Sequence, residues 1–230
     1  MLKRVKHELI LNNILKDIYN DRFLAPILGL KGGTAAYLIY NLPRFSVDLD
    51  FNLLDKEKID RVFERIKKIL EKYGRIKESS QKRNTLFFLL SFEEKFQNVK
   101  VEISLGDFGN NYEIINYLGL PILTMSKENM FVHKLVAIAE RKKIASRDLF
   151  DIHFFLEKNW PINEKIIEKR TGKNLKEYLK YLINFIDKNV SERNILFGLG
   201  EILSEKQKNW VKTNLKKEVL FLLKVYLRSI

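Results

Sequence analysis

A short stretch near the N-terminus combines a double glycine with two closely spaced carboxylates. Gly32 and Gly33 follow a short apolar run, and Asp48 and Asp50 are two residues apart. On a strand, positions i and i+2 point to the same side, so both carboxylates are expected on one face. Like charges this close are unfavourable unless a cation or a shared proton relieves them. Carboxylates together with substrate phosphates are the usual environment of Mg²⁺, so the pattern favours magnesium-dependent chemistry on a phosphorylated substrate.

The double glycine fits the other half of such a site. Two glycines at a strand-to-helix turn let the backbone approach a phosphate closely. The amides of Gly33 and Thr34, at the start of a helix, can then bind phosphate oxygens, and the Thr34 hydroxyl could add a donor. For the glycines alone a plain structural turn is equally compatible, and the two aspartates that follow favour function.

A third carboxylate repeats the pattern later in the chain. Glu102 lies in Val99–Leu105, where apolar and polar residues alternate. If this strand lies beside Val47–Phe51, Glu102 joins the two aspartates. Three carboxylates on adjacent strands can hold two divalent ions for in-line displacement at phosphorus. The alternative for Glu102 is a solvated polar face at the edge of the sheet.

The elements that must position these residues follow from periodicity. Apolar residues at helical spacing predict the helices Val5–Tyr19, Thr34–Leu42 and Ile59–Tyr73. Short apolar or alternating runs predict the strands Ile27–Leu30, Val47–Phe51, Thr85–Phe92 and Val99–Leu105, with Leu120–Thr124 as an edge strand. The strands Thr85–Phe92 and Val99–Leu105 are expected to pair across residues 93–98. After Met125 helical spacing dominates, so the chain is expected to divide into residues 1–124 and a helical part, residues 125–230.

Composition excludes several classes of protein. The chain has no Cys and 3 His among its 230 residues, which excludes a disulfide scaffold and thiol catalysis and disfavours a zinc site. No apolar run is long enough to predict a membrane span, and no signal peptide is visible, so a cytoplasmic protein is expected. The net charge of +13 suggests a polyanionic partner, most simply nucleic acid. The alternative is a set of solvated lysine-rich faces.

These residues resemble the nucleotidyltransferase superfamily of the DNA polymerase β type. Within it, the stretch LKGGTAAYLIYNLPRFSVDLDF resembles the AbiEii/AbiGii toxin family. A second block supports the resemblance, because Lys134 begins a K-x-x-A sequence and RDLFD follows at 147–151. The resemblance implies an α+β fold, in which a polymerase β-like nucleotidyltransferase core with a mixed β-sheet is followed by a C-terminal helical domain.

The resemblance also implies a role for each matching residue. In the first block Gly32, Gly33 and Thr34 would line the nucleotide phosphates, Ser46 would touch nucleotide or phosphate, and the metal ligands would be Asp48, Asp50 and Glu102. In the second block Lys134 would contact the triphosphate, Asp148 or Asp151 would complete the site, and Arg147 would pair with one of these aspartates or with phosphate. The alternative for the second block is a structural salt-bridge network that holds two helices together.

The activity that the resemblance implies is magnesium-dependent transfer of a nucleotidyl group from a nucleoside triphosphate, with two Mg²⁺ ions during turnover. It further implies the toxin of a type IV toxin–antitoxin system used in phage defence, with a cognate antitoxin. The acceptor would be RNA, such as the 3′ end of tRNA, which fits the basic charge. A small-molecule or protein acceptor is the first alternative, and a non-catalytic binding module is the second.

Overall fold

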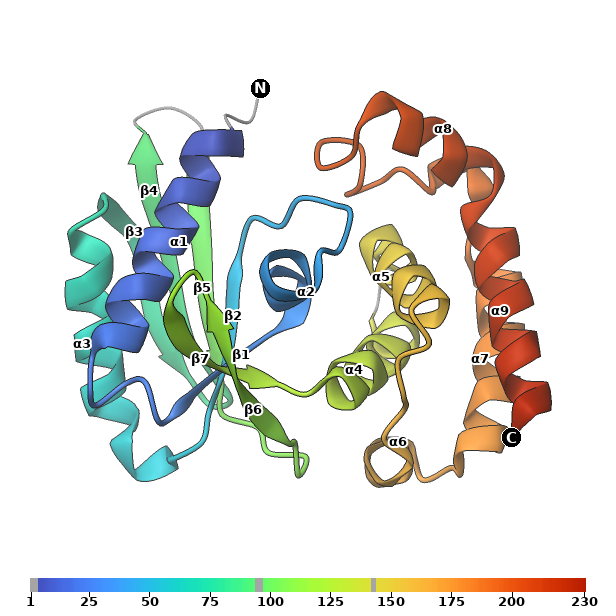
Figure 1. Ribbon diagram of the computed structural model, residues 1–230, viewed down its shortest axis with the longest axis horizontal. Helices are drawn as coiled ribbons and strands as arrows, with labels where there is room; N and C mark the ends of the chain where they lie inside the picture. The colour runs from blue at the N-terminus through green and yellow to red at the C-terminus, as the bar shows by residue number, and fades with distance from the viewer. Residues whose placement is uncertain (1–3, 94–96, 142–143) are drawn as a thin grey trace. The chain divides into compact units, whose positions relative to one another are not determined.

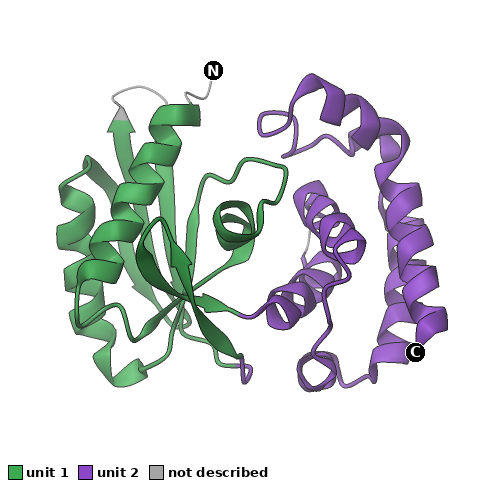
Figure 2. Ribbon diagram, viewed as in Figure 1, with its two compact units in different colours: residues 1–107, 111–125 green, residues 108–110, 126–230 purple. Residues whose placement is uncertain are grey.

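The computed structural model describes residues 4–93, 97–141 and 144–230. These residues form two compact units (Figure 2). Unit 1 falls within residues 1–107 and 111–125, and unit 2 falls within residues 108–110 and 126–230. In the described part of the chain, no helix is long and apolar enough to cross a membrane.

Unit 1 is built on a mixed sheet of seven described strands in the order β3-β4-β5-β2-β1-β7-β6. The strands are β1 (Leu28–Lys31), β2 (Leu49–Leu53), β3 (Arg75–Lys82), β4 (Thr85–Glu93), β5 (Gln97–Ser104), β6 (Tyr112–Tyr117) and β7 (Leu120–Met125). The pairs β1–β7 and β2–β5 are parallel, and the other neighbours are antiparallel. The helices of this unit are α1 (Arg4–Asn20), α2 (Gly32–Tyr40) and α3 (Ile59–Glu71), with the short 3-10 helix η1 (Lys56–Lys58) before α3.

The core of unit 1 lies between the sheet and the pair α1 and α3, which run side by side along it (Figure 1). Both helices carry apolar residues at helical spacing, so each presents one apolar stripe. Leu11 and Ile14 of α1 and Ile66 of α3 are fully buried, as is Phe51 of β2. The same strand leaves Asp50 partly exposed, so alternation along β2 separates a core face from a polar face.

The predicted strand pairings that place the third carboxylate are confirmed. Strand β5 pairs in parallel with β2, and Glu102 lies opposite Asp50 in the register. Strands β4 and β5 pair antiparallel, as expected. The connection expected over residues 93–98 includes residues 94–96, which lie outside the described residues.

Three details of the sheet differ from expectation. Strands β3 and β6 were not predicted from the sequence. Strand β3 has the sequence RIKESSQK, whose mainly polar residues are exposed at an edge of the sheet. The predicted edge strand β7 is not at the edge, because β6 pairs with it on the outer side.

Unit 2 is helical in its described residues. Its helices are α4 (Lys127–Glu140), α5 (Ser146–Glu157), α6 (Glu164–Thr171), α7 (Leu175–Asn189), α8 (Glu205–Thr213) and α9 (Leu215–Ser229), with the short 3-10 helix η2 (Glu192–Asn194). Helix α5 lies at the centre, packed against α4 and α9, and most of its residues are buried. The Phe155 ring stacks on Trp160 with the ring centroids 4.1 Å apart. These aromatic residues therefore build the core of unit 2.

Candidate active site

The double-glycine turn follows β1, and helix α2 begins at Gly32, two residues earlier than expected. Gly32 has a φ of 77°, a conformation that L side chains rarely adopt. A Cβ atom at this position would lie 2.9 Å from Asp50 Oδ2. The absence of a side chain therefore lets the Asp50 carboxylate reach the N-terminus of α2.

The first prediction is that Gly32→Ala severely impairs the site. The substitution adds left-handed backbone strain of about 1–2 kcal/mol and pushes the Asp50 carboxylate away, so we expect a loss of nucleotidyl transfer on the order of a hundredfold. The matched control is Gly119→Ala, because Gly119 has a φ of 84° and no atom within 4 Å of an added Cβ. Steady-state kinetics and thermal unfolding of both variants provide the measurement. Equal losses of activity would mean that the contact with Asp50 is unimportant.

The three predicted metal ligands lie together on the polar side of β2 and β5. Asp48 directly precedes β2, Asp50 lies within it, and Glu102 lies opposite Asp50 on β5. The Lys100 ammonium lies among them, with its Nζ 3.6 Å from Asp48 Oδ2 and 3.4 Å from Glu102 Oε2. Lys100 was not predicted as a site residue, although it shares a strand face with Glu102 at a spacing of two.

Electrostatic effects within this cluster are strong. Burial raises the pKa of Asp50; Lys100 opposes this effect, while the Asp48 and Glu102 carboxylates add to it. Burial by itself lowers the pKa of Lys100, but the three carboxylates outweigh burial and raise it. The structure therefore favours the protonated, charged form of Lys100, and a nearby cation in turn stabilises the charged form of the carboxylates.

The loop that carries Ser46 and Asp48 is held by hydrogen bonds from Thr34 and His7. Thr34 Oγ1 lies 2.8 Å from Ser46 Oγ and also hydrogen-bonds the Asp48 carbonyl. A ring nitrogen of His7, Nε2, lies 2.8 Å from the Val47 carbonyl oxygen. Thr34 is fully buried, so its hydroxyl holds this loop against α2, and its expected contact with a nucleotide phosphate stays a prediction.

A buried arginine at the glycine turn was missed by the sequence analysis. Arg44 is 5% exposed, and a Cβ added at Gly33 would lie 2.6 Å from Arg44 Nη2. Its Nη1 donates to the Phe45 carbonyl at 3.2 Å. The only sequence signal for it is a cation placed between Pro43 and Phe45 in a mainly apolar stretch. The guanidinium adds positive charge next to the amides at the start of α2.

The chemistry of this cluster suits a divalent cation. Its donors are carboxylate oxygens, which Mg²⁺ prefers, and the lysine ammonium shows where a positive charge is stabilised. In the described part of the chain, no three His, Asp or Glu side chains are already arranged to hold a metal ion. A metal ion would therefore need Asp48, Asp50 and Glu102 to adjust around it and the Lys100 ammonium to move.

Three of the predicted residues of the second block, Lys134, Asp148 and Asp151, form a cluster within unit 2. Lys134 Nζ lies 2.7 Å from Asp148 Oδ1 and 2.9 Å from Asp151 Oδ2. Both aspartate side chains have 0% exposure, and that of Lys134 has 15%. These bonds join α4 to α5, as the structural alternative for this block predicts. The contact of Lys134 with the triphosphate and the contribution of Asp148 or Asp151 to the catalytic site stay predictions.

The arginine in this cluster is Arg141, which was not among the predicted site residues, and the expected contact of Arg147 with phosphate stays a prediction. Arg141 Nε lies 2.9 Å from Asp148 Oδ2, whereas Arg147 makes no ion pair with the residues that the structure describes. The spacing of four between Arg147 and Asp151 permits a pair along one helix. Asp151 bonds instead to Lys134 on the neighbouring helix.

The chain matches a known protein family and several solved structures. Residues 13–215 match the family model described as nucleotidyl transferase AbiEii toxin, type IV TA system. No curated protein matches the chain. A Helicobacter pylori protein named as a nucleotidyltransferase is 22% identical with a TM-score of 0.68, over 100% of this chain and 96% of the other.

Two further solved structures share the fold. JHP933 from Helicobacter pylori is 22% identical with a TM-score of 0.56, over 100% of this chain and 97% of that one. The antibiotic-resistance factor ANT(2'')-Ia is 15% identical with a TM-score of 0.51, over 74% and 92% respectively. The similarity to JHP933 covers both units of the chain. Because the sequence identities are low, these structures show a shared fold and nothing further.

Proposed function

Because the chain belongs to the AbiEii family of nucleotidyl transferase toxins of type IV toxin–antitoxin systems, we propose that it transfers a nucleotidyl group from a nucleoside triphosphate to RNA. The proposed acceptor is the 3′ end of tRNA, and the proposed cofactor is Mg²⁺. The observation that carries the catalytic part is the pairing of Asp50 with Glu102 across β2 and β5, beside the Gly32 turn.

Different residues of unit 1 bind the phosphates and the metal ions in this reaction. The amides at the start of α2 and the Arg44 guanidinium bind phosphate oxygens. Asp48 and Asp50 would hold the divalent ions, with Glu102 as the third carboxylate. When bound, Mg²⁺ would neutralise phosphate charge and make the attacking hydroxyl more acidic. The acceptor hydroxyl loses its proton to solvent and its oxygen bonds to the α-phosphorus. The bond between the α-phosphorus and the oxygen that bridges to the β-phosphate breaks, and pyrophosphate leaves with that oxygen.

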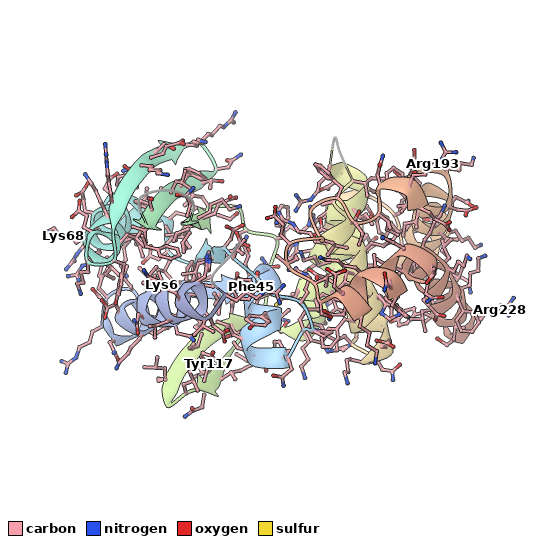
Figure 3. All side chains as sticks on the ribbon, turned by 90° about the horizontal axis from the view of Figure 1, so that it is seen from above. Lys6, Phe45, Lys68, Tyr117, Arg193 and Arg228 are labelled. Carbon is pink, nitrogen blue, oxygen red and sulfur yellow. The ribbon has the colours of Figure 1, made fainter. Side chains whose placement is uncertain are left out.

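The surface charge supports an RNA acceptor. The chain carries 42 Lys and Arg against 29 Asp and Glu, and many of the cations are exposed. Figure 3 shows Lys68, Arg193 and Arg228 extending outward from the ribbon. Contacts between such cations and phosphates dominate the affinity for nucleic acids and make it sensitive to salt.

The second prediction is that the protein labels tRNA in a salt-dependent reaction. Total tRNA is incubated with Mg²⁺ and each of four α-labelled nucleoside triphosphates in turn, and at least one nucleotide is expected to enter the RNA. The apparent affinity for tRNA should fall at least about tenfold between about 50 and 200 mM salt.

Each other outcome of this assay has a defined meaning. Label in protein or in a small molecule, with little salt dependence, would replace the RNA acceptor by one of the alternatives. No label in any acceptor with any nucleotide would contradict the enzymatic proposal and favour a binding module. Membership of a type IV toxin family also implies a cognate antitoxin, whose addition should suppress the labelling.

A further inference from the structure

Lys100 occupies an unusual place for a lysine. Its side chain is 29% exposed, and its Nζ lies between Asp48 and Glu102, at 3.6 and 3.4 Å. It also interacts electrostatically with the Asp50 carboxylate. A single ammonium thus interacts with three carboxylates, which come from β2, from β5 and from the residue before β2.

This position is the one that a divalent cation would need. Three neighbouring carboxylates repel one another, and a cation among them removes that repulsion. An ammonium and a metal ion cannot both be at the centre of the cluster, because both would need the same carboxylate oxygens and two cations a few ångströms apart repel one another. Occupation by Lys100 and occupation by a metal ion therefore compete.

We propose that Lys100 is the resident counter-ion of this carboxylate cluster and keeps divalent cations out of it until nucleotide binds. The proposal rests on the proposed function, because it takes the cluster to be the metal site of the transferase. The oxygens of a bound triphosphate offer the ammonium a new partner, so Lys100 can leave the carboxylates when the substrate arrives. Lys100 is thus a positioning residue, and metal and nucleotide bind with positive coupling.

The test measures Mn²⁺ binding in the absence of nucleotide, by the electron paramagnetic resonance signal of free Mn²⁺. We expect Lys100→Met to bind Mn²⁺ at least about tenfold more tightly than the unmodified chain, because the competing charge is gone. The matched control is Lys77→Met, since Lys77 is exposed on β3 of the same sheet and its loss changes the net charge equally. Lys77→Met should bind Mn²⁺ as the unmodified chain does.

A second substitution locates the new binding. In Lys100→Met combined with Asp50→Asn the gain in Mn²⁺ affinity should disappear, because one of the carboxylates is gone. Equal Mn²⁺ affinity of Lys100→Met and the unmodified chain would overturn the proposal. A gain of the same size in Lys77→Met, or one that survives the loss of Asp50, would also overturn it.

Thermal unfolding separates this role from a merely structural one. Without metal, Lys100→Met should melt at a lower temperature than the unmodified chain, and Mn²⁺ should raise its melting temperature and so abolish the difference. A melting temperature that Mn²⁺ leaves low would contradict the proposal. If Lys100→Met does not fold, Lys100→Gln serves in the same measurements. Since no nucleotide is present, a failed labelling assay would refute the transferase without deciding these results.

Discussion

Replacing Asp50 with asparagine is expected to reduce nucleotidyl transfer by about a thousandfold while leaving the chain at least as stable. The loss of activity follows because the substitution removes a metal ligand from the cluster, and metal ions supply several kcal/mol of transition-state stabilisation. Steady-state labelling of the acceptor measures it. Asp60→Asn is the matched control, because Asp60 is exposed in the first turn of α3.

The stability half of this prediction follows from the direction of the Asp50 pKa. Burial and the Asp48 and Glu102 carboxylates raise this pKa, although Lys100 opposes them. A raised pKa in the folded state means that ionisation of Asp50 destabilises the fold as the pH rises above the pKa of the unfolded chain. Asparagine avoids that loss at pH 7 to 8. A lower melting temperature of Asp50→Asn without metal would show that the carboxylate is structural.

Replacing Lys134 with methionine is expected to destabilise unit 2 by about 3–5 kcal/mol, the usual cost of leaving a buried ion pair without one partner. Asp148 and Asp151 have no exposure and both bond to the Lys134 ammonium. Their negative charges would then repel one another in a buried setting. Denaturant unfolding measures the loss, and adding Asp148→Asn with Asp151→Asn should recover most of it.

The control for this experiment is Lys180→Met, since Lys180 is exposed on α7 and should change stability little. A loss of less than about 1 kcal/mol in Lys134→Met would contradict the structural role, because an ion pair worth so little is typical of exposed sites. If stability is retained and the affinity for nucleoside triphosphate falls, Lys134 binds nucleotide, as the family resemblance implies.

Residue spacing was enough to predict most of what positions the first carboxylate cluster. Alternation in Val99–Leu105 placed Glu102 on a polar face, and the parallel pairing of β5 with β2 then sets Glu102 opposite Asp50. The helical periodicity of Ile59–Tyr73 likewise predicted α3, whose bounds are Ile59–Glu71. Each of these elements has one buried face and one exposed face, so apolar and polar residues recur in its sequence with the period of a helix or a strand.

The features that the sequence did not predict have no such periodic pattern of apolar residues. Strand β3 is an edge strand with a mainly polar sequence, and charged residues at an edge prevent further pairing without marking a buried face. The contacts of Thr34, Arg44 and Lys100 depend on which atoms meet in three dimensions. The choice of Arg141 over Arg147 as the partner of Asp148 has the same origin, because it depends on the packing of α4 against α5.

The parallel pairing of β2 with β5 has a consequence for a toxin during its own synthesis. Parallel neighbours cannot be joined by a tight hairpin, and here the connection contains α3, β3 and β4. A nascent chain that has emerged only through β4 would carry the glycine turn and both aspartates but neither Glu102 nor Lys100. The carboxylate cluster is therefore incomplete until β5 has been made, and a fragment that ends before β5 lacks its third carboxylate and its lysine.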